Sequence, residues 1–439
     1  MAVAALAIEP VAWAISREEF GIISMKKPSL LFLAHRIPFP PNKGDKIRSF
    51  NMLKKLGEQF DVHLGCFIDD PFDQQFVAEL NKYCKSLYCL KQNKLLAKVK
   101  GLSGFINAKP ITLPYYFNRK MQLWVDAIIA EQQIGKIFIY SSSMAQYCQQ
   151  SKFNSLERVI DFVDVDSDKW RQYAEKKTGI ARWFYTREQQ LLAKFEDEIC
   201  LLFNHSLFVS ADEAELFKER QPKALQSKVK GLLNGVDIKY FDPNGQFDHE
   251  PLVPKVPFIC FTGAMDYWAN VDAVIWFNQF VWPLILKQQP DAIFCIVGGN
   301  PSAEVQALAR QKGVLVTGRV KDVRPFIGKA DCIVAPLQIA RGIQNKVLEA
   351  MSLNKAIVVT SMAMAGINAR RSADIDIVDD CQVFADCCIK HLEQGQALAV
   401  DNVDNCDNRA WIMHHFTWQQ TLAPLNQLFQ QDGAFNENI

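Results

Sequence analysis

The sequence predicts an α/β protein built from two doubly wound, parallel-sheet domains. Short apolar runs alternate with longer amphipathic segments along most of the 439 residues, as is typical of parallel strands joined by helices. The chain is too long for one ordinary domain. Residues 242–257 hold four prolines and show no periodicity, so they predict a linker between two series of runs.

The apolar runs give the expected strands. The first series lies at residues 29–34, 61–67, 86–90, 136–140, 158–163 and 206–210. The second series lies at residues 257–263, 292–298, 313–318, 331–336 and 355–361. Amphipathic segments between them, such as RSFNMLKKLGEQF and KVLEAMSL, predict the covering helices.

The two series of apolar runs also predict the domain boundaries. We expect an N-terminal domain at 25–241, the linker at 242–257 and a C-terminal domain at 258–405. Residues 406–439 predict a helix that either closes the second domain or crosses back to the first. We interpret residues 1–24 as an extension upstream of the native start or as an extra surface helix.

The N-terminal stretch does not predict a membrane segment. Its apolar run, VAALAIEPVAWAI, is short and broken by Glu9 and Pro10. It also lacks the basic start and the cleavage site of a signal peptide. Two lysines and an apolar run follow Met25, which looks like a natural beginning.

Composition excludes several classes of protein. Hydrophobic residues make up 49% and charged residues 22%, which is a soluble globular composition. The net charge of +1 gives no indication of a nucleic-acid ligand. The 12 cysteines are scattered, with neither Cys-x-x-Cys pairs nor zinc spacing. We expect reduced, buried thiols in a cytoplasmic protein.

Loops that follow strands are the candidate sites, because ligands of open α/β sheets bind beyond the carboxyl ends of the strands. In the loop 35–50, Gly44 permits close backbone approach and the next helix start offers N–H groups to an anion. Lys43, Lys46 and Arg48 add positive charge. The alternative is a Pro-rich surface loop with solvated lysines.

Four aspartates lie near the end of the strand at 158–163 or closely after it, namely Asp161, Asp164, Asp166 and Asp168. An Asp-x-Asp pair can hold a divalent cation beside a diphosphate, and a single Asp can act as a base. Capping of the next helix by Ser167 or Asp168 is the structural alternative.

Two loops of the second series are further candidates. In the loop after 257–263, Gly263 allows a ligand to touch the backbone.

In the loop after 331–336, Gly342 frees a helix N-terminus for a phosphate, and Arg341 and Lys346 can neutralise phosphate charge. Glu349, on the same helical face as Lys346, can accept two ribose hydroxyls; a surface ion pair between these two side chains is the alternative.

Three motifs carry a family resemblance. They are LLNGVDIKYFDP (232–243), GIQNKVLEAMSLNKAIVVTSMAMAGI (342–367) and HHFTWQQTL (414–422). Their order and spacing from Met25 onward resemble glycosyltransferase family four. PFPPNKGDKIRS and DFVDVDSDKWRQYA resemble, more narrowly, the sugar transferases associated with exosortase/PEP-CTERM exopolysaccharide systems of Gram-negative bacteria.

The resemblance implies a GT-B fold, with two Rossmann-like domains facing each other across a cleft. The first domain would take the acceptor and the second a UDP- or GDP-linked sugar. The implied reaction is a retaining transfer without a catalytic metal or other cofactor. The implied acceptor is a saccharide or a lipid-linked saccharide, at the cytoplasmic side of the inner membrane.

Roles also carry over by position. Glu349 would bind the donor ribose, while Lys346, Arg341 and the Gly342 helix start would face the diphosphate. The remaining implied site residues are Arg319 and Val320 along the nucleobase, Gly44 at the donor phosphates, and Asp164 near the reacting sugar. Gly263 is a donor-site candidate from its loop alone.

The sequence departs from the family pattern at two places. The first Glu of the usual Glu-x7-Glu pair is Arg341, and the basic pair usually found after the first strand of domain two is absent from GAMDYWAN. Two other functions therefore stay open: a degenerate, non-catalytic nucleotide-binding protein, and a sugar-nucleotide epimerase.

Residues 91–124 interleave lysines and arginine with Leu, Phe, Tyr and Trp, without an acidic residue. This pattern suits an anionic bilayer and a lipid-phosphate acceptor. The alternative is a solvated helix followed by a packed, Pro-rich loop.

Overall fold

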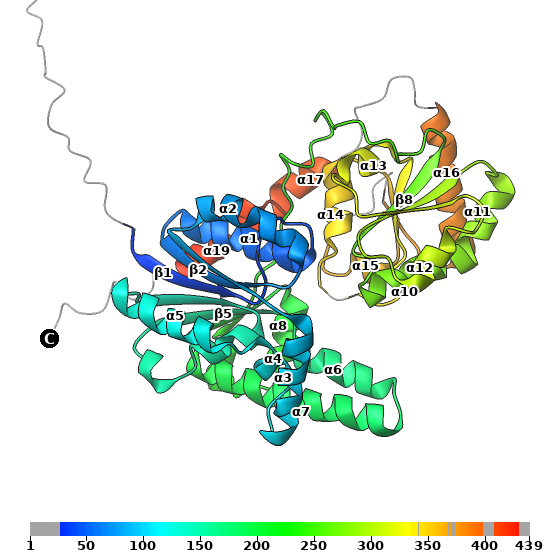
Figure 1. Cartoon of the computed structure of the whole chain (residues 1–439). Coiled ribbons are helices and arrows are strands. Elements are labelled where there is room, and N and C mark those ends of the chain that lie inside the picture. Colours follow the sequence, from blue (N-terminus) through cyan, green and yellow to red (C-terminus); the bar gives the residue numbers. More distant parts are fainter. Residues whose placement is uncertain (1–26, 341, 368, 370–374, 398–407, 430–439) are drawn as a thin grey trace, which may run out of the picture.

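The computed structural model describes residues 27–340, 342–367, 369, 375–397 and 408–429. These residues form two parallel sheets, each with helices on both faces (Figure 1). The first sheet has the strand order β3-β2-β1-β4-β5-β6-β7, and the second has the order β10-β9-β8-β11-β12-β13. The predicted α/β architecture with two doubly wound sheets is therefore confirmed.

The first sheet is built from residues 29–231. Its strands are β1 (Ser29–Ala34), β2 (Asp61–Ile68), β3 (Ser86–Lys91), β4 (Lys136–Tyr140), β5 (Glu157–Val163), β6 (His205–Phe208) and β7 (Val229–Gly231). The accompanying helices are α1 (Gly44–Gly57), α2 (Val77–Leu80), α3 (Lys94–Ile106), α4 (Thr112–Tyr116), α5 (Arg119–Glu131), α6 (Asp166–Glu175), α7 (Gly179–Leu202), α8 (Ala211–Lys218) and α9 (Lys223–Gln226).

The second sheet is built from residues 258–377. Its strands are β8 (Phe258–Thr262), β9 (Ile293–Val297), β10 (Val314–Gly318), β11 (Cys332–Ala335), β12 (Ile357–Val359) and β13 (Ile375–Ile377). The helices that follow β8 along the chain are α10 (Trp268–Trp276), a π-helical turn (Phe277–Val281), α11 (Trp282–Gln288), α12 (Ala303–Leu308), α13 (Arg324–Lys329), α14 (Asn345–Ser352), α15 (Ser361–Met364), α16 (Cys381–Ala397), α17 (Asn408–His415), α18 (Trp418–Thr421) and α19 (Ala423–Gln427).

Each expected strand is present, with ends that differ by at most two residues. Two further strands, β7 and β13, were not predicted. Each has only three residues and lies at a sheet edge, so neither offers an apolar run long enough to be recognised.

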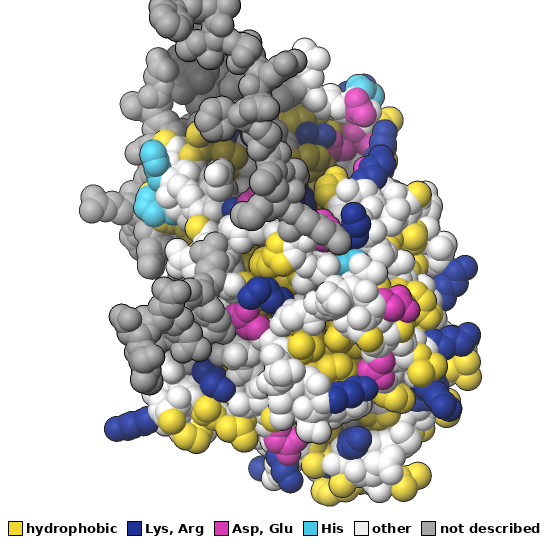
Figure 2. Space-filling model, turned by 90° about the vertical axis from the view of Figure 1, so that its left-hand side faces the viewer, with side chains coloured by type: hydrophobic (Ala, Val, Ile, Leu, Met, Phe, Trp, Pro, Cys, Tyr) yellow, Lys and Arg dark blue, Asp and Glu magenta, His cyan; other side chains and the backbone are white. Residues whose placement is uncertain are grey.

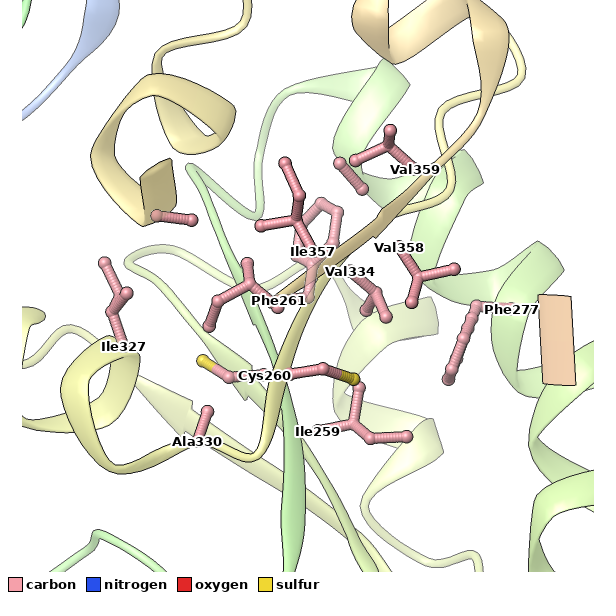
Figure 3. Packing of buried hydrophobic residues seen from close by; sticks show 14 of the residues in the cluster. Ile259, Cys260, Phe261, Phe277, Ile327, Ala330, Val334, Ile357, Val358 and Val359 are labelled. Carbon is pink, nitrogen blue, oxygen red and sulfur yellow. The ribbon is translucent and has the colours of Figure 1, made fainter. Parts of the chain in front are cut away.

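Both sheets are buried on their two faces, which explains why their strands read as continuous apolar runs. In the second sheet, Ile259, Cys260 and Phe261 of β8 are fully buried and pack close to Val334 of β11 and Ile357 of β12 (Figure 3). Burial of such side chains is the main favourable contribution to folding.

The end of the chain joins the two halves of the molecule. Helix α17 packs on α14 of the second half, whereas α19 lies beside α1 of the first half (Figure 1). Leu422 and Leu425 belong to the same buried cluster as Leu30 of β1. Residues 406–407 and 430–439 of the predicted C-terminal helix lie outside the described residues.

Two motifs of the sequence meet at this crossing. Val236 of the NGVD segment forms a parallel bridge with Thr417 of the FTW segment. A Cβ at Gly235 would lie 2.6 Å from the Trp418 backbone nitrogen, so only glycine fits there. The residues 1–24 assigned to an extension lie outside the described part of the chain.

None of the helices in the described ranges is long and apolar enough to cross a bilayer.

Candidate active site between the two sheets

Loops at the carboxyl ends of the two sheets meet each other. The Arg319 guanidinium, just after β10, lies 3.3 Å from Asp70 Oδ2, after β2. Lys43 Nζ, before α1, lies 3.8 Å from Asp266 Oδ2, after β8. The carboxyl ends of parallel strands are where open α/β sheets bind ligands. The meeting of two such edges therefore marks the cleft between the domains as the candidate site.

A small polar cavity of ≈60 Å³ lies in this cleft. Both halves of the molecule contribute charged and amide side chains to its wall. They are Arg36, Asn42, Lys43, Lys46, Asp69, Asp70, Asp73 and Lys94 from the first half, and Asp266, Asn300 and Arg319 from the second.

Two helix N-termini face each other across the cleft. Helix α1 begins at Gly44 and α14 begins at Asn345. A Cβ placed on Gly44 would lie 3.9 Å from Asn345 Nδ2, and Asn345 Oδ1 accepts a hydrogen bond of 3.2 Å from Asn234 of the first half. Free N–H groups and the positive ends of two helix dipoles make this gap favourable for an anion.

Lys346 lies in the first turn of α14 and is buried, with 8% of its surface exposed. Its Nζ donates a hydrogen bond of 2.6 Å to Asn270 Oδ1 and lies 4.0 Å from the centre of the Phe261 ring. Burial lowers the pKa of Lys346 to about 7, although Glu349 acts in the opposite direction. A buried amine held by a neutral amide is ready to take a charged ligand.

Asn270 links this lysine to the loop after β8. Its Nδ2 donates to the Ala264 carbonyl oxygen at 2.9 Å. A Cβ at Gly263 would lie 2.7 Å from Asn270 Nδ2. Gly263 is therefore required by the packing of Asn270, which is a more specific reason than the ligand contact expected from the sequence.

Glu349 lies one turn after Lys346, and burial raises its pKa to about 7 against the effect of Lys346. Among the described residues no ion pair joins the two side chains, because Lys346 is turned to Asn270. The surface ion pair considered as an alternative is thus not what the structure shows. The amine is buried and the carboxylate is partly buried, and the two groups interact electrostatically.

Gly342 lies in the loop before α14 and does not begin the helix, which corrects the expected helix start. Its φ of +61° is left-handed, so this residue cannot form the first right-handed turn. A Cβ there would lie 2.9 Å from Val209 Cγ1 of the first half. Gly342 thus lets the two halves approach each other. Arg341, the neighbouring candidate, lies outside the described residues.

Asp164 forms an ion pair rather than standing free. Its Oδ2 accepts from Lys169 Nζ at 2.7 Å, and Asp166 Oδ1 accepts from the same nitrogen at 3.2 Å. Although burial opposes its charge, these two carboxylates keep the pKa of Lys169 well above its usual range, and Tyr267 of the second half adds to the effect. The ammonium group occupies the position between the carboxylates that a cation would take.

The other two aspartates have structural partners. Buried Asp161 accepts from Arg48 Nε at 2.8 Å, and Asp168 accepts from Arg171 Nε at 2.6 Å. Helix α6 begins at Asp166 with Val165 as its N-cap, so neither Ser167 nor Asp168 caps it from the N-cap position. Within the described ranges, no three His, Cys, Asp or Glu side chains come together as metal ligands.

The Arg319 side chain points to the first half of the molecule. Besides Asp70, it contacts the Phe72 ring at 4.6 Å. Val320 is partly buried against the core of the second sheet. Arg319 is therefore in the cleft, in contact with the opposite domain.

Asn270 and Lys169 are site residues that the sequence did not reveal. Asn270 and Asp272 are the two polar residues of the otherwise apolar segment WANVDAVIW, and this was a usable signal. Lys169 is one of many lysines, and only the fold shows that it reaches Asp164 and Asp166.

The comparisons with known proteins agree with this architecture. Residues 256–394 match the family model described as "Glycosyl transferases group 1". A protein described as "Uncharacterized 44.6 kDa protein in cps region", from Klebsiella pneumoniae, is 21% identical over 362 residues, which are 79% of this chain and 87% of that protein.

Solved structures resemble nearly the whole chain. Sucrose-phosphate synthase from Thermosynechococcus elongatus has a TM-score of 0.65 at 14% identity, over 92% of this chain and 99% of its own. HepE of Anabaena, in complex with UDP and glucose, has a TM-score of 0.60 at 12% identity, over 92% and 99%.

WaaG, a glycosyltransferase involved in lipopolysaccharide biosynthesis, has a TM-score of 0.60 at 13% identity, over 91% and 99% of the two chains. The fold of this protein is therefore that of the GT-B glycosyltransferases, and its second domain carries the group 1 glycosyltransferase pattern.

Proposed function

We propose that this protein is a glycosyltransferase that moves a sugar from a nucleotide-sugar donor to a growing saccharide. The observation that carries the proposal is buried Lys346, held by Asn270 beside Glu349 where α14 begins. The start of α1 faces this point from the first domain. The group 1 family match over residues 256–394 and the UDP bound to HepE support a nucleotide-sugar donor.

Transfer requires that the leaving nucleoside diphosphate be stabilised as its negative charge develops. Lys346 can supply this charge, because an anionic phosphate would raise its lowered pKa and hold it protonated. We place Arg341 and Gly342 at the same diphosphate, with Gly44 opposite. These groups act in a site from which closure of the two domains would exclude water.

The donor nucleoside would lie along the second domain. Glu349 is suited to accept the two ribose hydroxyls, and Gly263, Arg319 and Val320 would line the nucleobase side. Asp164 would lie near the reacting sugar, with its charge balanced by Lys169.

The transfer is proposed to be retaining and independent of metal ions and of other cofactors. The family resemblance supports retention. Metal independence is supported by Lys346 and two helix starts, which already provide positive charge for a diphosphate. Activity should therefore persist in EDTA. Loss of activity in EDTA with recovery on adding Mn²⁺ would contradict metal independence.

The acceptor is proposed to be a saccharide, lipid-linked, in exopolysaccharide biosynthesis at the cytoplasmic face of the inner membrane. The resemblance to exosortase/PEP-CTERM-associated sugar transferases supports this assignment, as does the similarity to a cps-region protein. A polymer-building role also fits the likeness to WaaG, a glycosyltransferase involved in lipopolysaccharide biosynthesis.

A degenerate binding protein is the second candidate, because Arg341 stands where the family pattern has Glu. The test is release of UDP or GDP from a panel of nucleotide sugars, with and without a lipid extract. A transferase releases nucleoside diphosphate and moves the labelled sugar into the lipid fraction. Tight donor binding without release would indicate the binding protein, and donor conversion without acceptor would indicate an epimerase.

A further inference from the structure

Helix α3 (Lys94–Ile106) buries small residues and exposes its large apolar side chains. Its buried residues are the small ones, Ala97, Gly101 and Gly104. The large apolar side chains face solvent instead: Leu95 is 75% exposed, Val99 65%, Leu102 61% and Ile106 87%. Their spacing of four, three and four residues places them on one helical face. A helix that folds only against its own protein would bury this face.

The orientation of α3 is fixed by its glycines. A Cβ at Gly104 would lie 2.7 Å from the Lys109 carbonyl oxygen, and one at Gly101 would lie 3.3 Å from the Ile111 carbonyl oxygen. Only a side chain smaller than alanine's fits at the first position. The helix therefore cannot rotate to bury its leucines, because the gap beneath it admits only small residues.

The apolar surface continues onto α7. Phe105 of α3 stacks on Trp183 with ring centres 6.4 Å apart, and both Trp183 (59%) and Ile180 (86%) are exposed. We call Leu95, Leu96, Val99, Leu102, Ile106, Ile180 and Trp183 the α3 face. Contiguous exposed apolar side chains of this kind mark interaction surfaces.

Basic residues flank the α3 face. With 100° between successive residues, Lys98 and Lys100 fall on opposite sides of the stripe formed by Leu95 and Val99. No acidic residue occurs between positions 91 and 124. Figure 2 shows apolar and basic side chains next to each other over the lower part of the molecule.

We propose that the α3 face docks on an anionic lipid bilayer, with Leu95, Val99, Leu102 and Ile106 inserted at the headgroup level. Lysines on both sides of an apolar stripe, with a tryptophan at its edge, match the chemistry of such an interface. A second copy of the chain would bring lysines against lysines, which repel each other. The inference rests on the proposed lipid-linked acceptor, and it assigns the surface that brings the enzyme to it.

The position of α3 in the fold would bring a docked bilayer close to the cleft. Lys94, in its first turn, lines the polar cavity between the domains and lies 4.0 Å from Asp69. One end of the helix is thus at the cleft, and the apolar face along the rest of it is exposed. A bilayer in contact with the α3 face would lie next to the cleft opening, where the headgroup phosphate of a lipid-linked acceptor meets Lys94.

The test is flotation of the full chain with vesicles of phosphatidylcholine, with and without phosphatidylglycerol. The variant Leu95→Gln/Val99→Gln/Ile106→Gln alters only exposed positions, and should lose at least tenfold in binding to the anionic vesicles. Lys98→Glu/Lys100→Glu should bind at least tenfold more weakly to anionic vesicles only. Matched controls on the second domain, Val383→Gln/Met413→Gln and Lys287→Glu/Lys390→Glu, should bind as the wild type does.

Equal and negligible binding of the wild type to both kinds of vesicle would overturn the proposal. So would a dimer in sedimentation velocity that the triple glutamine variant converts to a monomer. Nucleoside diphosphate release in detergent separates this inference from the proposed function. A triple variant that keeps this release but loses vesicle binding supports docking, whereas a wild type that binds vesicles and releases none contradicts only the proposed function.

Discussion

Lys346 and Glu349 show how a binding site can reduce the stability of the free protein. Burial lowers the pKa of the amine and raises that of the carboxyl, in both cases to about 7. Above pH 7 the unfolded chain binds more protons at Lys346 than the folded chain does. Below pH 7 the unfolded chain binds fewer protons at Glu349 than the folded chain does. The contribution of this pair to the free energy of unfolding is therefore lowest near neutral pH and rises in both directions.

We accordingly expect Lys346→Met/Glu349→Gln to raise the melting temperature of the ligand-free protein at pH 7 by ~2 °C or more. The gain should shrink toward pH 4.5 and toward pH 10. Donor binding should be lost in the same variant. Differential scanning calorimetry across pH checks the first part, and a double variant that melts below the wild type at pH 7 would contradict it.

Asn270 gives a second prediction for a single residue. Its Oδ1 is the acceptor that holds Lys346 Nζ, so Asn270→Ala should let the amine move and should weaken donor binding about tenfold, corresponding to ~1.4 kcal/mol. Titration calorimetry with the nucleoside diphosphate measures this. Asn278→Ala is the control, because Asn278 is also buried but bonds Gln311 away from the cleft. Equal effects of the two variants on affinity would rule out a specific role for Asn270.

At the scale of elements, the loop before α14 gives a third prediction. Gly342→Ala meets two obstacles, a left-handed φ and Val209 of the other domain at 2.9 Å. Gly179 has a similar φ of +59° but open space around it. Both alanine variants should lose comparable backbone stability, of about 1 kcal/mol. Only Gly342→Ala should also reduce transfer, by about tenfold or more, because the added methyl group would hold the two domains apart.

A steady-state assay of diphosphate release, together with a melting curve, separates these two effects. If Gly179→Ala reduces transfer as strongly as Gly342→Ala, the close approach at Val209 has no role in the reaction.

The elements also show what the sequence could predict. Strands buried on both faces appear in the sequence as apolar runs, so β8 and β11 could be predicted, whereas the three-residue β7 could not. The loops chosen for the search do lie at the carboxyl ends of the two sheets. Their internal geometry was not accessible, since the start of α14 at Asn345 depends on the conformation of Gly342. Contacts such as Lys169 with Asp164 or Lys346 with Asn270 depend on distances in the fold, which spacing along the chain does not give.

At the scale of the whole molecule, two ion pairs across the cleft are weak, exchangeable contacts between the domains. The ion pairs Arg319–Asp70 and Lys43–Asp266 join partly exposed side chains. Each is worth at most ~1 kcal/mol and is screened by salt. We expect Asp70→Asn, or high salt, to increase the fraction of molecules with an open cleft, and nucleoside diphosphate to close it again.

Small-angle scattering or an interdomain fluorescence pair can follow this opening. Asp248→Asn is a suitable control, because its ion pair with Lys321 is almost fully exposed. An interdomain distance that responds to neither salt nor Asp70→Asn would show that these pairs do not hold the cleft closed.

The measurement that tests the donor site most directly is a crystal structure of the protein with UDP or GDP. The diphosphate should lie between the starts of α1 and α14, in contact with Lys346 Nζ, and the ribose hydroxyls should bond to Glu349. A nucleotide bound elsewhere on the chain, or one in the cleft that leaves Lys346 bonded to Asn270 and touches neither helix start, would contradict the proposed donor site.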